Sequence, residues 1–476
     1  MNAPKKIALF AGPIAAMLTT FWMMQYPSIP PEAARVAGLC IWMAIWWMTE
    51  PVALELTALL PMLVIPLTGL YPKDAMMKAC APYANESVYF FLGGFGLGLA
   101  IEKTQLHRVG AMVLLRYAGT NASRVVGAFM LATAGLSMWI NNTATTMLML
   151  PLAMSVIATT NHPSFSKSLL IGIAYAASIG GMGTLVGTAP NIYFAGYLKE
   201  NGMEIGFREW MFIAMPVVFV LLIGCWIWMV WILWPMRGVS VEIPSAWVEM
   251  QKERTAWNAQ QRTALIVFGV AAALWVFREP MMGLVQGRVI EDWLGAINDP
   301  WIAMAALACM LVFPLGAPVL EWKDVETIPW GVLLLFGGGL SLSTAISASG
   351  LDVQIGNVAS MLQGIPGWLV IVCVVVLVIA ISEMASNIAT ATTMIPVLAG
   401  AAPAMGLDPI ILLSATVLAS SCGFMMPVAT PPNTLVFAQK KFPVRDMLMA
   451  GFGVNLLAVI AIPPAVIWIL PWVLGR

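Results

Sequence analysis

The chain has 476 residues, of which 60% are hydrophobic and only 10% are charged. Soluble proteins carry about 25% charged residues, so this composition excludes a soluble globular protein and predicts a surface that mostly faces lipid. The 23 basic and 23 acidic side chains cancel, which excludes the strongly basic surface of a nucleic-acid-binding protein.

Long apolar segments follow one another along the chain and predict membrane-spanning helices rather than the alternating strands of a β-barrel. A helix of about 20 apolar residues crosses the hydrocarbon core, so we predict about eleven spans once interrupted segments are counted as single elements. We expect an all-α polytopic protein of the inner (plasma) membrane. The apolar segments lie at 7–26, 33–49, 52–70, 86–101, 109–117, 124–140, 144–158, 168–198, 208–235, 263–277, 300–319, 328–348, 366–384, 388–404, 409–428 and 448–473.

The most polar loop is 237–262, which carries both basic and acidic residues and divides the chain into two parts. Lys5 and Lys6 precede the first apolar segment. Basic residues accumulate on the cytoplasmic side of membrane proteins, so we place this loop and the N-terminus on that side.

The two parts of the chain repeat each other in sequence. Three pieces match in the same order at a nearly constant offset, which indicates an internal duplication. The matched pieces are Asn141–Thr145 with Ser386–Thr390 (offset 245), Leu92–Gly94 with Phe336–Gly338 (offset 244), and Gly187–Asn191 with Ala429–Asn433 (offset 242). The offset of 245, which relates 142 to 387, also relates Ser137 to Ser382.

Each part combines a Gly-rich apolar segment, a polar Asn/Ser/Thr cluster within an apolar helix, and a break rich in Gly, Thr, Pro and Asn. Irregular backbone at membrane depth is tolerated only where it is buried in protein or lines a cavity. Pro190, Pro427, Pro431 and Pro432 lack amide donors and are expected to stop helices. Freed carbonyl groups suit Na⁺, and amides at helix N-termini suit a carboxylate. The paired breaks therefore predict a binding site between the two parts.

A plainer interpretation is that Asn141, Asn142 and Asn387 only bond neighbouring helices, as membrane asparagines often do. Their recurrence beside a second paired break favours the binding site. For Glu383 two interpretations stay open: a carboxyl that carries a proton or adjusts cation affinity, and one that simply pairs with a helix end or neighbour. The stretch Gly94–Gly98 lacks the βαβ setting of a dinucleotide loop, so close helix packing explains it better.

The sequence contains no zinc-binding cluster, nucleophile elbow or P-loop, so we expect neither an enzyme nor an ATP-driven pump. A channel would repeat pore-lining residues along a continuous path. Paired interrupted helices favour a carrier instead.

The second break, from Ser420 to Val436, closely resembles the signature of the divalent anion/sodium symporter family, whose members carry di- and tricarboxylates or sulfate. Trp46–Pro61 and Ile101–Gly110 are similar to that family as well. The resemblance covers most of the chain. It implies two inverted repeats with re-entrant hairpins and broken helices, arranged in a homodimer that works as an elevator.

The resemblance also implies a division of the chain into scaffold and transport parts. Residues 1–80 would be scaffold helices of the first repeat, and 81–205 its transport part with a hairpin and a broken helix. Residues 206–325 would hold the last span of the first repeat, the polar loop and the scaffold helices of the second. Residues 326–476 would be the second transport part and the final span.

Residue by residue, the resemblance implies two sodium sites and one substrate site, with Na⁺ as coupling ion and no organic cofactor. Two positions depart from the family: Asn141 stands where it has Ser, and Ile388 where it has Thr. The first Na⁺ would lie near Ser137, Asn141, Asn142 and Gly187, and the second near Ser382, Ala385, Asn387 and Ala429. The substrate carboxylates would meet Asn141, Asn142, Thr143, Thr188, Ser386, Asn387, Thr430 and Pro431.

Sodium coupling has a physical reason in this sequence. A dicarboxylate is poorly stabilised in a low-dielectric interior, and neither Asn cluster nor its partner break contains Lys or Arg. Compensation must come from helix N-termini, amides and bound cations. We therefore expect sodium-driven symport of a C4-type dicarboxylate such as succinate, malate or fumarate. A sodium-independent dicarboxylate exchanger and a sulfate-type anion carrier remain the alternatives.

Overall fold

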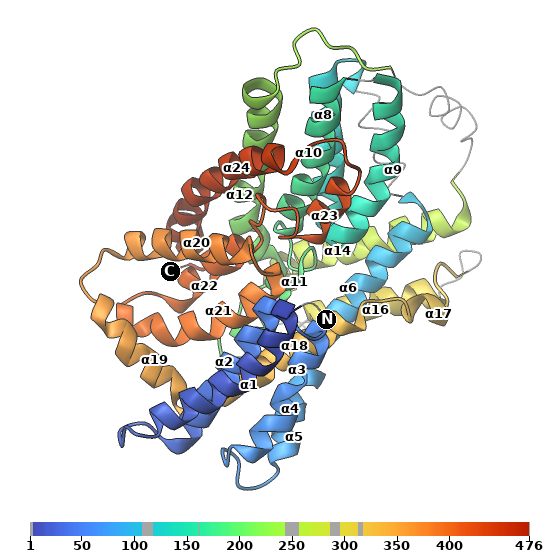
Figure 1. Ribbon diagram of the computed structural model, residues 1–476. Coiled ribbons are helices and arrows are strands. Elements are labelled where there is room, and N and C mark those ends of the chain that lie inside the picture. Colours follow the sequence, from blue (N-terminus) through green and yellow to red (C-terminus); the bar gives the residue numbers. More distant parts are fainter. Residues whose placement is uncertain are drawn as a thin grey trace.

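The computed structural model shows a bundle of helices of unequal length (Figure 1). The structure describes residues 3–106, 118–160, 162–242, 257–285, 296–312 and 318–475. Residues 243–256 of the predicted cytoplasmic loop lie outside the described residues, as do 107–110 of the family-like stretch Ile101–Gly110.

The first part of the chain contains long helices and short ones that follow one another closely. They are α1 (Ala3–Met23), α2 (Pro31–Thr49), α3 (Leu54–Ala58), α4 (Leu60–Val64), α5 (Ala75–Cys80), α6 (Glu86–Lys103), α8 (Ala122–Ser137), α9 (Asn142–Thr160), α10 (Pro163–Gly181), α11 (Ala189–Glu200) and α12 (Phe207–Ile227).

The second part follows the same succession of long helices and short broken ones. Its helices are α14 (Ala259–Val285), α16 (Asp299–Val312), α17 (Trp322–Val325), α18 (Trp330–Ser349), α19 (Leu351–Ala359), α20 (Gly367–Ser382), α21 (Asn387–Ala401), α22 (Pro409–Ser420), α23 (Pro431–Phe437), α24 (Val444–Pro464) and α25 (Leu470–Val473).

Side chains explain where several helices begin. Asn85 accepts a hydrogen bond from the Ser87 amide (2.8 Å) before α6, and Asn121 accepts one from the Arg124 amide (3.1 Å) before α8. Asp408 does the same for the Ile410 amide (2.8 Å) at α22. Each cap satisfies an amide that has no partner within the helix.

Six helices in the described part of the chain are long and apolar enough to cross a membrane, or seven if one bent pair counts as a span. That pair is Leu351–Leu362 with Gly367–Ser382, which turns by 115°. Further apolar helices of 10–17 residues accompany them. The predicted number of eleven spans stays a prediction.

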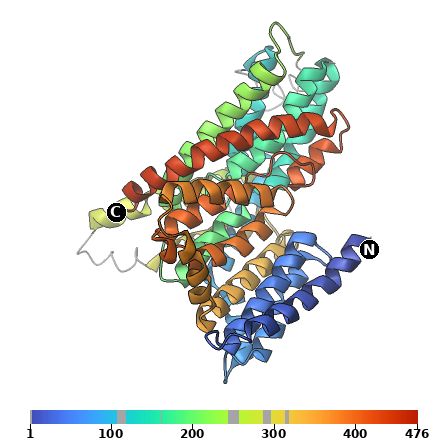
Figure 2. The same ribbon diagram turned by 60° about the vertical axis from the view of Figure 1, so that its left-hand side comes forward.

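One group of helices forms an apolar core of its own. Helices α2, α3, α4 and α18 contribute Met43, Ala58, Leu60 and Leu342 to this core, and other residues of α18 belong to the larger core. Figure 2 shows α1 to α5 gathered at one side of the molecule, away from α8 to α10, α12 and α24, while α18 lies against α2 and α3 and also contacts α11. The larger core joins the helices that carry both Asn clusters and both breaks.

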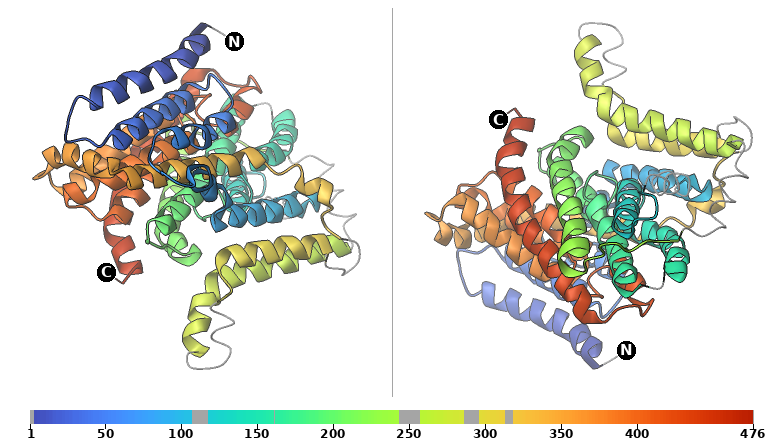
Figure 3. Two further views of the ribbon diagram at one scale, coloured as in Figure 1. Left: turned by 90° about the horizontal axis from the view of Figure 1, so that it is seen from below. Right: turned by 90° about the horizontal axis from the view of Figure 1, so that it is seen from above.

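A glycine-rich face of α6 packs closely against α16, as predicted for the stretch 94–98. A Cβ atom on Gly93 would lie 2.4 Å from the carbonyl carbon of Ala303, and one on Gly96 would lie 2.5 Å from Leu307 Cδ1. Helices α14 and α16 run together beside α6 in both views of Figure 3. The absence of side chains on this face lets the backbones approach.

Candidate functional site

The first Asn cluster lies between two helices and not, as predicted, within one. Helix α8 ends at Ser137, four residues form a turn (residues 138–141, here tip 1), and α9 begins at Asn142. The two helices contact each other along their sides. Asn141 explains the new start because its Oδ1 accepts a hydrogen bond from the Ala144 amide (2.8 Å), as a helix cap does.

Oxygen atoms from the two residues that flank tip 1 and from the neighbouring break converge. The Ser137 hydroxyl donates to Asn142 Oδ1 at 2.8 Å. A Cβ atom on Gly181 would lie 2.3 Å from that Oδ1 and 3.2 Å from the Gly187 carbonyl oxygen, and one on Gly187 would lie 2.9 Å from the Ser137 carbonyl oxygen. The predicted ligands Ser137, Asn142 and Gly187 therefore lie together, with Gly181 between them. Hydroxyl, amide and carbonyl oxygens are the donors that a hard cation prefers.

The second Asn cluster repeats this geometry. Helix α20 ends at Ser382, residues 383–386 form tip 2, and α21 begins at Asn387. The Ser382 hydroxyl donates to Asn387 Oδ1 at 3.1 Å and also to the Ser420 carbonyl. A Cβ atom on Gly423 would lie 3.1 Å from the Ser382 carbonyl oxygen and 3.2 Å from Ala429 Cβ. Ser382, Asn387 and Ala429 thus lie together, as their counterparts do in the first part.

Two buried asparagines organise the breaks. Break 1 (residues 182–188) separates α10 from α11, and break 2 (residues 421–430) separates α22 from α23. Asn191 Nδ2 donates to the carbonyls of residues 181, 182 and 184 at 3.2, 3.1 and 2.7 Å. Asn433 Nδ2 donates to the carbonyls of residues 423 and 426, both at 3.0 Å. Residues 181 and 184 match 423 and 426 at the offset of 242, so the duplication extends to individual hydrogen bonds.

The prolines act differently from the prediction for three of the four positions. Pro190 is the second residue of α11, and Pro431 and Pro432 are the first two of α23. Proline favours the first turn of a helix, where the missing amide has no intrahelical partner. These prolines therefore begin helices rather than stop them. Pro427 lies inside break 2.

The two parts meet through these elements. Helix α9 contacts α23, and α11 contacts α21. Each Asn-bearing helix of one part therefore packs against the helix that follows the break of the other part. The N-termini of these helices carry the positive ends of the helix dipoles, which suit an anion.

The other predicted site residues lie on the tips and helix starts. Ser386 caps α21 by accepting a hydrogen bond from the Ala389 amide (3.3 Å), the role that Asn141 has at α9. Thr188 and Thr430 are buried residues at the starts of α11 and α23. Ala385 is buried in tip 2, whereas Thr143 and Ile388 are half-buried and Pro431 is exposed. In the described part of the chain, Ala385 shares no hydrogen bond with Asn387, with which the resemblance groups it; the Ala385 amide donates to the Ile381 carbonyl at 3.0 Å instead.

Glu383, whose role the sequence left open, is a paired carboxylate. It is 8% exposed and accepts hydrogen bonds from three successive amides of break 2, those of Phe424, Met425 and Met426, at 2.8, 2.8 and 2.9 Å. The Asn455 side chain in α24 donates a fourth at 2.7 Å. Sequence reasoning did not single out Asn455 because nothing in its neighbourhood marks a residue that contacts position 383.

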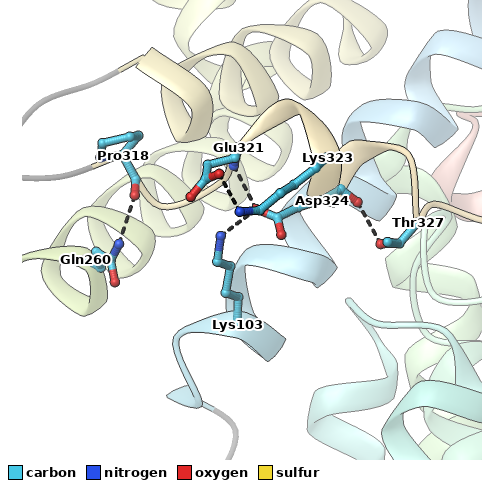
Figure 4. Close-up of polar contacts among 7 residues, drawn as sticks. All are labelled: Lys103, Gln260, Pro318, Glu321, Lys323, Asp324 and Thr327. Carbon is cyan, nitrogen blue, oxygen red and sulfur yellow. Dashed lines mark hydrogen bonds and ion pairs between the residues drawn. The ribbon is translucent and has the colours of Figure 1, made fainter.

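A cavity of about 360 Å³ opens beside tip 1. Asn141 and Ala144 line it together with Glu102 near the end of α6 and the segment Thr327–Pro329. Figure 4 shows the polar contacts next to this segment. Lys103 forms an ion pair with Asp324, and Gln260 donates to the Pro318 carbonyl at 2.9 Å.

Asp324 belongs to the short helix α17. Burial works against its charged form, but hydrogen bonds from the Glu321 amide and from Lys103 lower the pKa of this carboxyl below its ordinary value. The carboxylate therefore stays charged and ties the end of α6 to the segment before α18.

Comparison with known proteins agrees with this geometry. Residues 44–417 match the citrate transporter family. The chain is 32% identical to the sodium-dependent dicarboxylate transporter SdcS of Staphylococcus saprophyticus and 33% identical to SdcS of Staphylococcus aureus, strain bovine RF122. Each alignment spans 496 residues and covers 100% of this chain and 93% of the relative. The chain belongs to this family of di- and tricarboxylate carriers.

Solved structures of transporters share the fold of this family member. The YdaH transporter of Alcanivorax borkumensis aligns with a TM-score of 0.62 at 14% identity, covering 87% of this chain and 98% of that one. MtrF of Neisseria gonorrhoeae aligns with a TM-score of 0.57 at 14% identity, covering 84% and 85%. The carrier is thus an all-helical, multi-pass integral membrane protein whose relatives and structural neighbours are transporters.

Proposed function

We propose that this carrier is a secondary active transporter that couples Na⁺ to the uptake of a C4-type dicarboxylate such as succinate, malate or fumarate. The observation that carries the proposal is the matched pair of serine–asparagine contacts around the tips, where Ser137 with Asn142 and Ser382 with Asn387 bring oxygen atoms together next to the breaks. The sequence contains no Lys or Arg in either tip or either break. Bound cations would then supply the positive charge that a dicarboxylate requires.

The names of the relatives support the same conclusion, because both SdcS proteins are described as sodium-dependent dicarboxylate transporters. We assign the two Na⁺ ions and the substrate to the groups of residues that the resemblance implies. For the first Na⁺ these are Ser137, Asn141, Asn142 and Gly187, and for the second Ser382, Ala385, Asn387 and Ala429. The substrate residues are Asn141, Asn142, Thr143, Thr188, Ser386, Asn387, Thr430 and Pro431.

The proposal includes the mechanism and the assembly. In the division that the resemblance implies, α2 to α4 belong to a static scaffold, and the helices that carry the tips and breaks, together with α6 and α18, belong to the transport domain that slides as an elevator. We propose a homodimer in the plasma membrane. Na⁺ would order the tips and breaks and thereby reduce the cost of holding the anion; by linkage, the anion would tighten Na⁺ binding by the same factor.

Uptake into proteoliposomes tests the function. Purified protein is reconstituted with a choline or a Na⁺ gradient, and uptake of labelled succinate is measured while sulfate, citrate or tartrate competes. We expect saturable succinate uptake that requires external Na⁺. This uptake should become faster when an ionophore compensates the charge that transport carries across the membrane. Succinate uptake that is independent of Na⁺ but requires dicarboxylate inside the vesicles would identify an exchanger. Strong competition by sulfate alone would identify an inorganic-anion carrier.

A further inference from the structure

Basic side chains gather at one end of the helices that lead to and from the two breaks. Three candidate membrane spans have an end here: α9 at Thr160, the span that contains α12 at Leu233, and the span that contains α24 at Val444. The Lys and Arg residues next to these ends, and those near the starts of α8 and α10, are here called the basic end. They are Arg124, Lys167, Arg237, Lys440, Lys441 and Arg445.

Contacts between the elements join these residues into one surface. Lys167, near the start of α10, pairs with Asp446 in the first turn of α24 at 3.1 Å. Its Nζ also lies 4.6 Å from the centre of the Trp234 ring, which directly follows the span of α12. The segment after Trp234 reaches the start of α8 through a backbone bridge between Asn121 and Ser240. The starts of α8, α10 and α24 and the end of the α12 span are therefore neighbours.

A short loop between α23 and α24 exposes three of the cations. The Phe442 side chain is 7% exposed and packs edge-on against Phe437, the last residue of α23, with ring centres 5.9 Å apart. Between these two rings the chain turns at Lys440, whose φ of 55° is in the left-handed region. The aromatic pair anchors the loop, while Lys440, Lys441 and Arg445 are exposed. Within the part of the chain that the structure describes, these three have no ion-pair partner.

Few acidic groups offset the charge of the basic end. Among the described residues of 120–124, 159–168, 234–242 and 438–446, the acidic side chains are Glu242 and Asp446. Asp446 is already paired with Lys167. The basic end therefore keeps a net positive charge at the ends of membrane spans.

The opposite end of α12 has the reverse character. A cavity of about 560 Å³ at that end is lined by several carboxylates, and the two basic side chains in its wall form ion pairs with them. The pairs are Lys199 with Glu86 and Arg278 with Asp299, and Glu204 and Glu209 line the same cavity. Exposed cations without a partner are thus a property of one end of this helix and not of both.

Cations at the ends of membrane spans lie at the level of the lipid headgroups. Each Lys or Arg near an anionic membrane surface raises affinity for that surface about fivefold. We propose that the basic end binds the headgroups of anionic phospholipids in the leaflet at its level. Such a lipid contacts the start of α10, which leads to break 1, and the loop after α23, which follows break 2. This inference is independent of the proposed sodium coupling.

Thermal unfolding of the full-length protein in detergent tests the proposal without a variant. Tryptophan fluorescence is followed while dioleoylphosphatidylglycerol, dioleoylphosphatidylcholine or inorganic phosphate is added. We expect saturable stabilisation by phosphatidylglycerol, because a ligand of the folded state raises its apparent stability, and a weaker effect when the KCl concentration is raised about tenfold. Equal stabilisation by phosphatidylcholine would show a general effect of lipid. Equal stabilisation by inorganic phosphate would show a site for a free anion. Either result would overturn the proposal.

A pair of lysine variants locates the binding surface. Lys440→Gln combined with Lys441→Gln should raise the mole fraction of phosphatidylglycerol for half-maximal stabilisation by about 25-fold, the product of two fivefold factors. Lys73→Gln combined with Lys78→Gln is the matched control. Both of these lysines are exposed, in or just before α5, which lies far from α8 and α10 (Figure 1). The control should keep the lipid dependence of the wild type, and an equal loss in both double variants would overturn the proposal.

Arg445→Gln provides a second variant outside the loop, for the case that the lysine variant does not fold. It replaces one exposed side chain and should raise the half-maximal mole fraction about fivefold. A lipid dependence that stays unchanged in this variant would overturn the assignment of the basic end, whatever the behaviour of the lysine variant.

Discussion

The first and second oxygen clusters differ in which groups of the protein hold the neighbouring break in place. Around the second cluster, break 2 is bound through its amides by Glu383 and through its carbonyls by Asn433. Around the first, break 1 is bound through its carbonyls by Asn191 and through the Gly187 amide by Thr184. Both clusters keep the same Ser–Asn hydrogen bond. Duplication therefore preserved the Ser–Asn hydrogen bond and the asparagine of each break, while the contacts between tip and break diverged.

The largest loss of transport is expected from replacing the asparagine that each of the two clusters contains. Asn142→Ala and Asn387→Ala each remove the oxygen that accepts a hydrogen bond from the paired serine. A contact with a charged ligand contributes about 3 kcal/mol, so affinity should fall roughly 100-fold and transport should be abolished. Proteoliposome uptake at equal reconstituted amounts measures this. Wild-type rates in either variant would refute the assignment of that cluster.

Much of this arrangement was predictable from the sequence, since the duplication and the two oxygen clusters depend on local motifs that repeat at fixed offsets. The family was predictable from Ser420–Val436 in the same way. Other features depend on pairs that are distant in sequence. The contact between Glu383 and Asn455 joins residues 72 positions apart, and no local pattern marks it. The helix starts at Asn142 and Asn387 were also missed, because an apolar segment on either side of the cluster obscured the turn between two helices.

The next largest loss of uptake should differ between the two clusters, because a Cβ atom has less space at the glycine beside the first cluster than at the glycine beside the second. Gly181→Ala places a Cβ atom 2.3 Å from Asn142 Oδ1, whereas Gly423→Ala places one 3.1 Å from the Ser382 carbonyl oxygen. Overpacking of this kind costs about 1–3 kcal/mol, so Gly181→Ala should lower Na⁺-dependent uptake by roughly tenfold or more and Gly423→Ala by less. The half-saturating Na⁺ concentration for uptake is the measurement. Equal losses would contradict the geometry of the first cluster.

Gly187→Ala also compares the space beside the two clusters, because it introduces the residue type that the second part has at the matching position. Ala429 occupies the matching position in the second part, but a Cβ atom on Gly187 would lie 2.5 Å from the Gly181 carbonyl oxygen. We expect a loss similar to that of Gly181→Ala, because the carbonyls of break 1 approach more closely. The reverse change, Ala429→Gly, is the matched control and should retain most of the uptake. A harmless Gly187→Ala would show that the two breaks have equivalent space.

A smaller effect, on the thermal unfolding temperature, should distinguish the asparagines that support the two breaks. Asn191→Ala removes hydrogen bonds to three carbonyls, and Asn433→Ala removes hydrogen bonds to two. Each leaves buried acceptors without donors, which costs about 1–3 kcal/mol per group. Because Glu383 still holds break 2, Asn433→Ala should lower the thermal unfolding temperature less than Asn191→Ala. The opposite order would mean that Glu383 contributes little to the conformation of break 2.

The smallest effect concerns Ile388, where the family has Thr and the chain has no hydroxyl. Ile388 is half-buried in the first turn of α21, next to Asn387. Ile388→Thr would restore a donor for a substrate oxygen, and one neutral hydrogen bond contributes about 1 kcal/mol, so the KM for succinate should fall by up to about fivefold. The matching residue in the first part is Thr143, and Thr143→Ile should raise the KM by a similar factor. The first turns of α9 and α21 would then contribute equally to substrate binding through this position. If Ile388→Thr leaves the KM unchanged while Thr143→Ile raises it, the dicarboxylate is held asymmetrically, with its closer contacts on the first turn of α9.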